Sequence, residues 1–288
     1  MKAAKTAVVL AVLAIATSTA FCQIDSAFSA RQLGMGGAAV AVADDAFAWS
    51  QNPAGLPNVA TSAADGAWGA SVAGSYAFSS QDWNGFDLDA WDASASFVDP
   101  GKNWGVGGGY FRMSTDDYGI AKLYGFGVGG RFSKAYDQFN WGVSVMRLGA
   151  ENRAFGLKYE PNWEMIDVVN LGLMYDVRLP EMRPIRVGVT VFDVADEMDR
   201  TWTLGASFNA GSRLLIAADF IGAGSTRDRT FVFGGEYRLC SHFCLRAGDS
   251  DGQFTCGAGL KHGNLFVDYA HTQKEDERAN VVSAGLTF

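Results

Sequence analysis

The stretch ARQLGMGGAAVAVADDAFAWSQNPAGL, residues 30–56, is apolar and rich in glycine, yet it precedes the strands of the chain instead of belonging to them. Gly34, Gly36 and Gly37 lack side chains, which suits places where two backbones approach closely. A compact segment with so few charges requires burial inside something larger. The rest of the chain is the candidate container.

A short helix is predicted in the second half of this stretch, over residues 46–51. Asp44 and Asp45 precede it in the position of an N-cap. Asn52 stands before Pro53, and a residue before proline is pushed out of the helical region, so the helix should end there. A segment of this length cannot hold a core of its own, because chains below about 40 residues usually need a staple.

From residue 66 onward the sequence alternates with a period of two, as half-buried strands do. In the first run Val72, Tyr76 and Phe78 share an apolar face, whereas Ser71 and Ser75 share a small polar face. Strands are predicted at residues 66–79, 86–98, 103–113, 121–133, 138–148, 164–177, 184–194, 200–209, 213–222, 229–240, 243–249, 253–261, 264–271 and 279–288. The predicted fold is all-β, a closed antiparallel transmembrane β-barrel of about 14 strands, because lipid cannot satisfy an open backbone edge.

The connections and the aromatic residues support this interpretation. Connections after odd-numbered strands are predicted to be longer, such as 149–163 and 272–278, and those after even-numbered strands shorter, such as 209–212 and 240–242. That is the layout of an outer-membrane barrel. Outer-face aromatic residues form two girdles, which suit the two membrane interfaces. They are Trp104, Phe132, Phe139, Trp141, Tyr175 and Phe208 at the short-turn end, and Tyr76, Phe78, Tyr110, Tyr124, Phe126, Phe231 and Phe233 toward the long-loop end.

The composition limits the class of protein. The 288 residues include 35 glycines and only 6 prolines, which fits many strands with tight turns. The net charge of −8 makes nucleic acid an unsuitable partner. Residues 1–22 predict a secretory signal, with Lys2 and Lys5 ahead of an apolar core and small residues before the cleavage site.

Two patches of the sequence resemble the FadL/PorV superfamily of outer-membrane barrels. The first comprises Gly34-Met35-Gly36-Gly37-Ala38, Ala43-Asp44-Asp45 and Asn52-Pro53-Ala54-Gly55-Leu56. The second, similar to the closing strands of PorV-like members, comprises Gly234-Gly235-Glu236-Tyr237, Leu245-Arg246-Ala247-Gly248, Gly257-Ala258-Gly259-Leu260, Asp268-Tyr269-Ala270 and Ser283 to Phe288. In that superfamily the first patch folds into the lumen as a hatch. Behind the predicted signal peptide at 1–22, the resemblance therefore implies a hatch at 23–62 and a transmembrane barrel at 63–288, in the bacterial outer membrane.

The function that the resemblance implies is uptake of small hydrophobic molecules, such as fatty acids, across the outer membrane. The partners would be outer-membrane lipid and the hydrophobic molecule. One alternative is a PorV-like attachment or shuttle component that binds a secreted protein or the secretion machinery. Another is a structural surface barrel.

Neither an enzyme nor a bound cofactor is expected. His242, His262 and His271 do not share a barrel face with a serine in a catalytic arrangement. A metal site is not expected either, because histidine and cysteine do not cluster beyond residues 240–244.

Three consecutive glycines, Gly107, Gly108 and Gly109, interrupt the third predicted strand. Glycine weakens a strand interior and often marks a bulge or a bend. One interpretation is that they leave space for the hatch against the wall. The other follows the resemblance, since a kink in the third strand of FadL-type transporters opens a lateral exit from the lumen to the bilayer.

Charged residues fall on the predicted lumen face, and both signs are mixed. They are Asp92, Arg131, Asp176, Arg186, Asp219, Glu236, Arg238, Arg246, Lys261 and Asp268. They either mark a substrate path, in which Arg131 and Arg186 would hold a carboxylate, or form a paired network between wall and hatch.

The cysteines near the C-terminus are assigned separately. Cys240 and Cys244 flank a three-residue turn on the lumen face, and the periplasm is oxidising, so a disulfide between them is a candidate. Cys256 is predicted to face lipid and to stay unpaired.

Overall fold

The computed structural model describes residues 29–60, 62, 67–79, 88–99, 101, 103–115, 119–132, 139–152, 164–178, 183–195, 200–223, 229–274 and 277–288. The predicted signal peptide lies outside these residues. Short helices come first: α2 (Ala30–Leu33), α3 (Ala48–Gln51) and the 3-10 helix η1 (Pro53–Asn58). The strands are β1 (Gly69–Ser79), β2 (Leu88–Val98), β3 (Trp104–Thr115), β4 (Gly119–Arg131), β5 (Phe139–Asn152), β6 (Glu164–Val177), β7 (Ile185–Phe192), β8 (Thr201–Asn209), β9 (Leu214–Ala223), β10 (Thr230–Arg238), β11 (Phe243–Ser250), β12 (Gln253–His262), β13 (Leu265–Lys274) and β14 (Glu277–Thr287).

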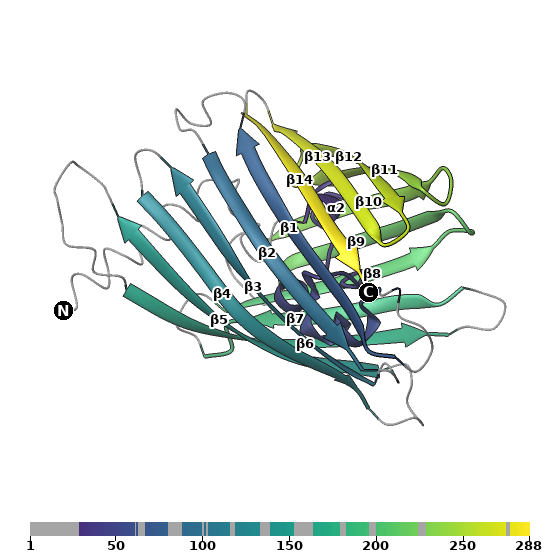
Figure 1. Ribbon diagram of the computed structural model, residues 1–288, viewed down its shortest axis with the longest axis horizontal. Coiled ribbons are helices and arrows are strands. Elements are labelled where there is room, and N and C mark those ends of the chain that lie inside the picture. Colours follow the sequence, from purple (N-terminus) through teal and green to yellow (C-terminus); the bar gives the residue numbers. More distant parts are fainter. Residues whose placement is uncertain are drawn as a thin grey trace.

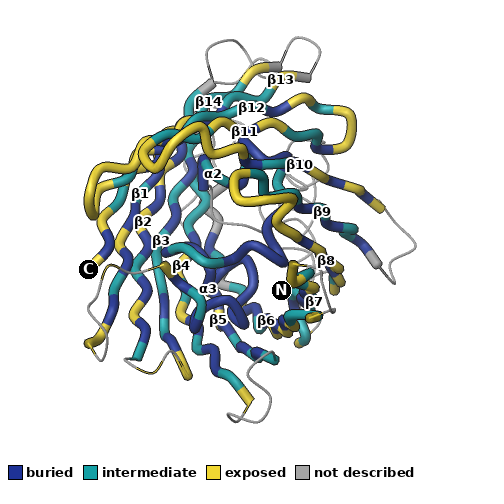
Figure 2. Tube along the Cα trace, turned by 90° about the vertical axis from the view of Figure 1, so that its right-hand side faces the viewer, coloured by how far each residue is buried: buried dark blue, intermediate teal, exposed yellow. Residues whose placement is uncertain are grey.

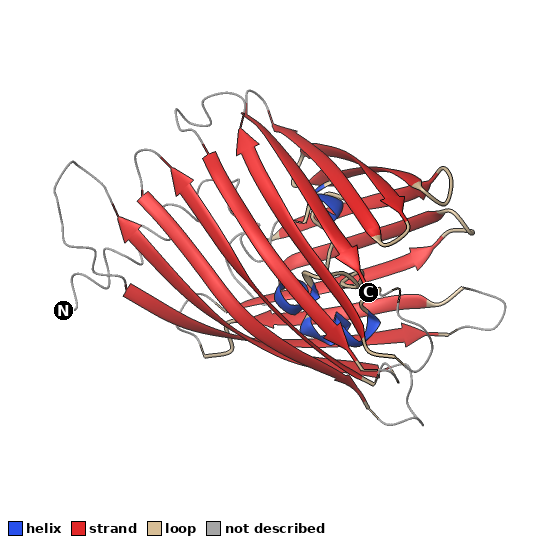
Figure 3. Cartoon of the chain, viewed as in Figure 1, coloured by secondary structure: helices blue, strands red, loops and turns tan. Residues whose placement is uncertain are grey.

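The strands β1 to β14 form one closed barrel (Figure 1, Figure 3). Each strand is antiparallel to the next in the chain, and β1 closes the ring against β14, with Ser71 opposite Thr287 and Ser79 opposite Ala279. Closure leaves no strand edge without a partner strand, which is the condition for crossing lipid. The predicted all-β fold of about 14 antiparallel strands is confirmed, and every predicted strand range overlaps an observed strand.

Side chains alternate between the two faces of the wall as the period of two predicts (Figure 2). In β1, Ser71, Ala73 and Ser75 are buried, whereas Val72 and Tyr76 are exposed on the outside. The outer face carries large apolar side chains around the ring. Exposed aromatic residues near the short-turn end include Trp104, Phe132, Tyr175 and Phe208, and those toward the other end include Tyr76, Tyr124, Phe126, Phe231 and Phe233.

The predicted alternation of short and long connections is only partly correct. The connection at residues 153–163 follows an odd-numbered strand and is long, as predicted. However, the loop predicted over 272–278 is reduced to residues 275–276, because the β13–β14 ladder continues through the pair Gln273 and Arg278.

Residues 29–60, hereafter the N-terminal segment, run along the inner side of the wall (Figure 1, Figure 3). η1 contacts β2 to β6 and α2 contacts β12 to β14, so the segment touches two arcs of the ring that lie on either side of β1. Its apolar residues are almost completely buried; Met35, Phe47, Trp49 and Leu56 are each at most 1% exposed. The segment therefore uses the wall as its core.

The local conformation of the segment follows its sequence with one correction. Asn52 is extended (φ −151°, ψ 102°) before Pro53, as predicted, and its side chain accepts a hydrogen bond from the Ala54 N–H. The helix begins at Ala48 instead of residue 46, and no side chain caps it. Asp45 instead accepts a hydrogen bond from the Phe47 N–H at 2.9 Å, a local turn that competes with the first helical turn.

Glycines on both partners allow the close approach. Gly36 has a left-handed backbone (φ 73°), and a Cβ there would lie 2.5 Å from the carbonyl oxygens of Phe233 and Asp249. On the wall, a Cβ at Gly107 would lie 2.9 Å from the Leu56 side chain. The prediction that the hatch glycines mark close backbone contacts is thus supported by the geometry.

β3 contains no break at its three glycines. It pairs continuously with β2 and with β4, and neither register shifts. The inner faces of Gly107 and Gly109 are covered by Leu56 and Trp49. Of the two interpretations of this run, the structure agrees with space for the N-terminal segment and has no kink at residues 107–109.

Within the described residues, no helix has the length and apolar character to cross a membrane.

Candidate functional site

Wall side chains hold the backbone of the N-terminal segment by hydrogen bonds at several points. Asp219 Oδ2 accepts from the N–H groups of Ala39 (2.7 Å) and Val40 (2.9 Å). Ser283 Oγ accepts from Ala30 N–H at 2.8 Å. All of these groups are buried, and a buried backbone N–H without a partner costs about 1–3 kcal/mol. The wall therefore replaces the hydrogen bonds that an irregular segment cannot make within itself.

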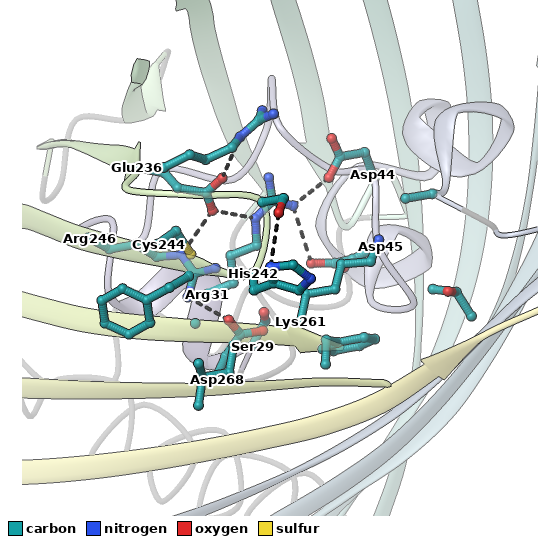
Figure 4. A pocket seen from close by; sticks show the side chains of 18 of the residues that line it. Ser29, Arg31, Asp44, Asp45, Glu236, His242, Cys244, Arg246, Lys261 and Asp268 are labelled. Carbon is teal, nitrogen blue, oxygen red and sulfur yellow. Dashed lines mark hydrogen bonds and ion pairs between the residues drawn. The ribbon is translucent and has the colours of Figure 1, made fainter. Parts of the chain in front are cut away.

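A charged cluster joins the segment to the wall near the short-turn end (Figure 4). Arg31 of α2 forms an ion pair with Asp44 of the segment, and its Nε donates to Glu236 Oε2 of β10 at 3.2 Å. Glu236 also accepts from Arg246 Nε at 3.0 Å, and Arg246 Nη1 donates to Asp268 Oδ1 at 2.6 Å. This is a paired network between wall and segment.

The charges inside this cluster affect one another. Asp44, and then Glu236 and Asp45, raise the pKa of Arg31 well above its ordinary value, so it is a permanent cation. Burial raises the pKa of Asp45 to about 6, although Arg31 Nη1 lies 3.9 Å from its Oδ2 and opposes the shift. Asp45 therefore titrates closer to neutral pH than an ordinary aspartate does.

A cavity of about 430 Å³ adjoins the cluster. Its lining combines the charged cluster with Cys240 and His242 of the short turn between β10 and β11 and with Cys244 of β11. The cavity at this end of the barrel therefore presents the charged groups of the cluster together with the apolar side chains of Phe47, Phe243, Leu260 and Phe266.

Toward the long connections, the lumen side of the wall carries a group of apolar side chains. The register aligns inward-facing Phe111, Leu123, Leu148 and Ile166 in one row across β3 to β6. These residues belong to one apolar cluster with Trp49. We call the following side chains the apolar band: Phe111, Met113, Leu123, Met146, Leu148, Ile166, Val168 and Phe192.

Trp49 lies where the N-terminal segment meets this band. Its ring fits against the inner face of the wall, where a Cβ at Gly125 would lie 2.6 Å from it and one at Gly109 3.0 Å. Its Nε1 donates to Ser94 Oγ at 3.2 Å. The indole therefore forms the floor of the apolar band.

The predicted lumen residues are not all brought to one place. Glu236, Arg246 and Asp268 meet in the charged cluster. Arg238 is more than half exposed at the rim, 3.8 Å from Glu236. Two others lie elsewhere on the ring: Arg131 Nη2 donates to Asn58 Oδ1 at 3.0 Å, and Arg186 Nε donates to Asp176 Oδ1 at 2.6 Å. The contacts of these side chains are with the protein itself, which agrees with the network interpretation.

The predicted disulfide is not formed in the structure, which has free thiols at Cys240, Cys244 and Cys256. The β10–β11 register sets Cys244 opposite Arg238, so Cys240 lies in the turn and not across from Cys244. Cys256 is on the outer face, between buried Thr255 and the inward side of Gly257.

The sequence analysis did not single out Arg31 or Trp49. It also did not predict that Asp219 accepts hydrogen bonds from two backbone N–H groups. The sequence does contain one indication for Arg31, which is the single basic residue of residues 29–60. A lone cation in an apolar buried stretch requires an acidic partner. The sequence does not say which wall carboxylate that is.

No protein-family model matches the sequence, and no curated protein matches it. Solved structures do match. The toluene transporter TbuX of Ralstonia pickettii is 14% identical over 91% of this chain and 98% of that chain, with a TM-score of 0.57. The toluene transporter TodX of Pseudomonas putida is 14% identical over 91% and 97%, with a TM-score of 0.51. A FadL homologue of Pseudomonas aeruginosa is 13% identical over 89% and 97%, with a TM-score of 0.52.

At the level of the fold, these matches agree: the chain is a closed 14-strand barrel that is similar in fold to these three structures. The resemblance to FadL seen in the sequence is confirmed for the fold, whereas the finer PorV-like likeness finds no counterpart among these structures. Two of the three are described as transporters and none as an enzyme.

Proposed function

We propose that the protein is an outer-membrane barrel that lets small hydrophobic molecules cross the membrane, and that the N-terminal segment plugs its lumen. Apolar and aromatic side chains cover the outside of the ring, as lipid contact requires. The segment is buried against two separate arcs of the wall, which supports its role as a plug.

The observation that carries the transport proposal is the apolar band. The interior of a membrane barrel is normally polar, because it is filled with water or with polar contacts. Here the lumen above Trp49 is lined by methionine, leucine, isoleucine and phenylalanine. Methionine side chains adapt to apolar guests of different shape. Such a lining favours a guest without charge, in line with the toluene named for two of the similar structures.

The two halves of the lumen suggest the route. Transfer of a hydrophobic molecule from water into the apolar band is favourable, whereas the cavity at the short-turn end exposes it to the charges of Arg31, Glu236 and Asp268. Exit sideways into the bilayer is therefore more favourable than passage into the periplasm. Gly107, Gly108 and Gly109 stay a candidate for this exit only if the segment moves, because Leu56 and Trp49 cover the wall there.

The alternatives receive less support. A secretion partner has no counterpart in the structures compared, and we propose no enzymatic activity and no cofactor. Arg131 and Arg186, the candidate carboxylate contacts, are occupied by Asn58 and Asp176. An uncharged guest therefore fits the lumen better than a fatty acid head group.

The test is uptake of radiolabelled toluene by proteoliposomes containing the purified protein. The double variant Met113→Asp/Met146→Asp puts charges into the apolar band and should lower uptake at least about tenfold, since a buried carboxylate costs several kcal/mol. Met113→Leu/Met146→Leu keeps the band apolar and is the matched control. Assembly of each variant is checked by the shift in gel migration on boiling. Wild-type uptake no faster than that of empty liposomes would refute the transport proposal.

A further inference from the structure

The cavity of about 430 Å³ at the short-turn end has an exposed part and a buried part (Figure 4). Arg238, His242 and Lys261 are exposed lining residues, so they mark where the cavity meets solvent, hereafter the mouth. Farther in, the lining consists of buried side chains, among them Phe47 and Glu236. A pocket of a few hundred Å³ that combines apolar walls with a few charged groups is typical of a site for a small organic molecule.

The strand register places the ammonium group of the mouth beside an aromatic ring. Lys261 stands directly opposite Phe266 across the β12–β13 pair, and both side chains line the cavity. Phe266 packs in turn against the apolar cluster that contains Phe47 of the N-terminal segment. One cation of the wall and two aromatic rings, one from the wall and one from the segment, therefore border on the same space.

The acidic groups of the cavity already have cationic partners within the protein. Every carboxylate that lines the cavity lies within 3.9 Å of Arg31 or Arg246. Lys261, by contrast, forms no ion pair with any residue that the structure describes. Arg238 lies 3.8 Å from Glu236, a carboxylate that Arg31 and Arg246 hold more closely. The cations of the mouth are thus available to a ligand, whereas the carboxylates farther in are not.

We infer that this cavity binds a small aromatic carboxylate, with its ring against Phe47 and Phe266 and its carboxylate on Lys261 and Arg238. A carboxylate accepts charge-assisted hydrogen bonds from an ammonium and a guanidinium group. Aromatic rings pack favourably edge to face or offset. The ligand would bridge the wall and the N-terminal segment. The inference does not depend on transport, because no residue of the apolar band lines this cavity.

A ligand-observed NMR titration of the purified protein in detergent tests the inference, with benzoate as the probe. At about pH 7.5 a carboxylate and a lysine carry opposite charges. Arg238→Gln/Lys261→Gln should raise the Kd for benzoate at least about tenfold, because two charge-assisted contacts are lost. The matched control is Arg178→Gln/Arg183→Gln, which removes two exposed cations of the connection between β6 and β7, outside the cavity. Its Kd should stay within about twofold of wild type.

Two further probes separate the ring from the carboxylate. Acetate should bind at least about tenfold more weakly than benzoate, because it buries no ring. Benzylamine, which has the ring and the opposite charge, should not displace benzoate.

The inference would be overturned if wild type showed no saturable binding of benzoate, or if the Kd were unchanged in the Arg238/Lys261 variant or raised equally in the control. Equal binding of acetate would also overturn it, because the site would then be one for free anions, and so would displacement by benzylamine. Toluene uptake is measured separately, and the methionine variants leave the cavity unchanged. Failure of one proposal is therefore distinguishable from failure of the other.

Discussion

Replacing Trp49 with alanine should release the N-terminal segment while leaving the barrel closed. Trp49 is 1% exposed, and its ring fills the space beside two wall glycines and hydrogen-bonds to Ser94. A buried Trp→Ala change costs about 3–5 kcal/mol. Each 1.4 kcal/mol is a factor of ten, so the equilibrium between docked and released segment should shift about a thousandfold. The ladder of β1 to β14 does not include Trp49 and should not open.

Limited trypsin digestion followed by mass spectrometry measures this shift. Arg31 is the only tryptic site in residues 29–60 and is held in the charged cluster when the segment is docked. Cleavage after Arg31 tracks the released population when release is fast relative to cleavage. Trp68→Ala, a change at an outward ring that is 57% exposed, is the matched control and should leave the cleavage rate unchanged. If Trp49→Ala is cut no more than about twofold faster than wild type in a barrel that still shifts on boiling, the docking argument fails.

Three further predictions concern the same segment. Asp219→Asn should weaken the docking of the segment by about 1–2 kcal/mol, because a neutral amide oxygen is a weaker acceptor for two N–H groups. Hydrogen exchange at the backbone amides of Ala39 and Val40 should speed up about tenfold. Asp176→Asn is the control and should leave this exchange rate unchanged. Asp45→Asn should stabilise the fold at pH 8 but not at pH 4. The pKa of Asp45 rises to about 6 on folding, so burying its charge destabilises the folded state only where the carboxyl is ionised. This destabilisation is absent below about pH 4, grows between about pH 4 and 6, and is complete above pH 6. Denaturant unfolding of both proteins across this range measures the difference, and a constant difference would contradict the burial of Asp45. Gly142→Ala should weaken the docking of the segment by about 1–3 kcal/mol, because the added Cβ would overlap the Pro53 backbone. Gly74→Ala, on the outer face, is the control and should leave the docking unchanged. Equal rates of tryptic cleavage in the two variants would contradict this prediction.

The strands of the wall could be predicted from the sequence, because each strand's alternation of outward and inward side chains can be recognised without knowing its partner strands. Lipid outside and polar or small groups inside impose a period of two on every strand, and residues such as Val72 and Ser71 show it without reference to any partner. The same reasoning located the glycine-rich segment as something to be buried. Pre-proline sterics alone were enough to end its helix at Asn52.

Contacts between distant parts of the chain were harder to predict, because sequence spacing does not contain them. The partners Arg31 and Glu236 are separated by 205 residues, and only the closed ring brings them together. The disulfide between Cys240 and Cys244 failed for a related reason, since a hairpin register decides which residues face each other. The glycines of β3 were ambiguous because glycine serves both a bend and a close contact, and only Trp49 and Leu56 decide between them.

The different chemistry of the two ends of the lumen relates the proposed plug to the proposed exit. An apolar molecule that moves past Trp49 passes from the apolar band to the cavity that contains Arg31, Glu236 and Asp268. It then loses the free energy of apolar burial, which is about 25 cal/mol per Å². The bilayer beside the wall offers the same gain as the band. Trp49 and Leu56 cover the lumen side of the β3 glycines, so a sideways exit there requires the segment to shift. If the exit lies at these glycines, release of the segment and uptake of toluene should therefore rise together across the Trp49, Asp219 and Gly142 variants, and uptake that stays constant while the segment is released would place the exit elsewhere on the ring.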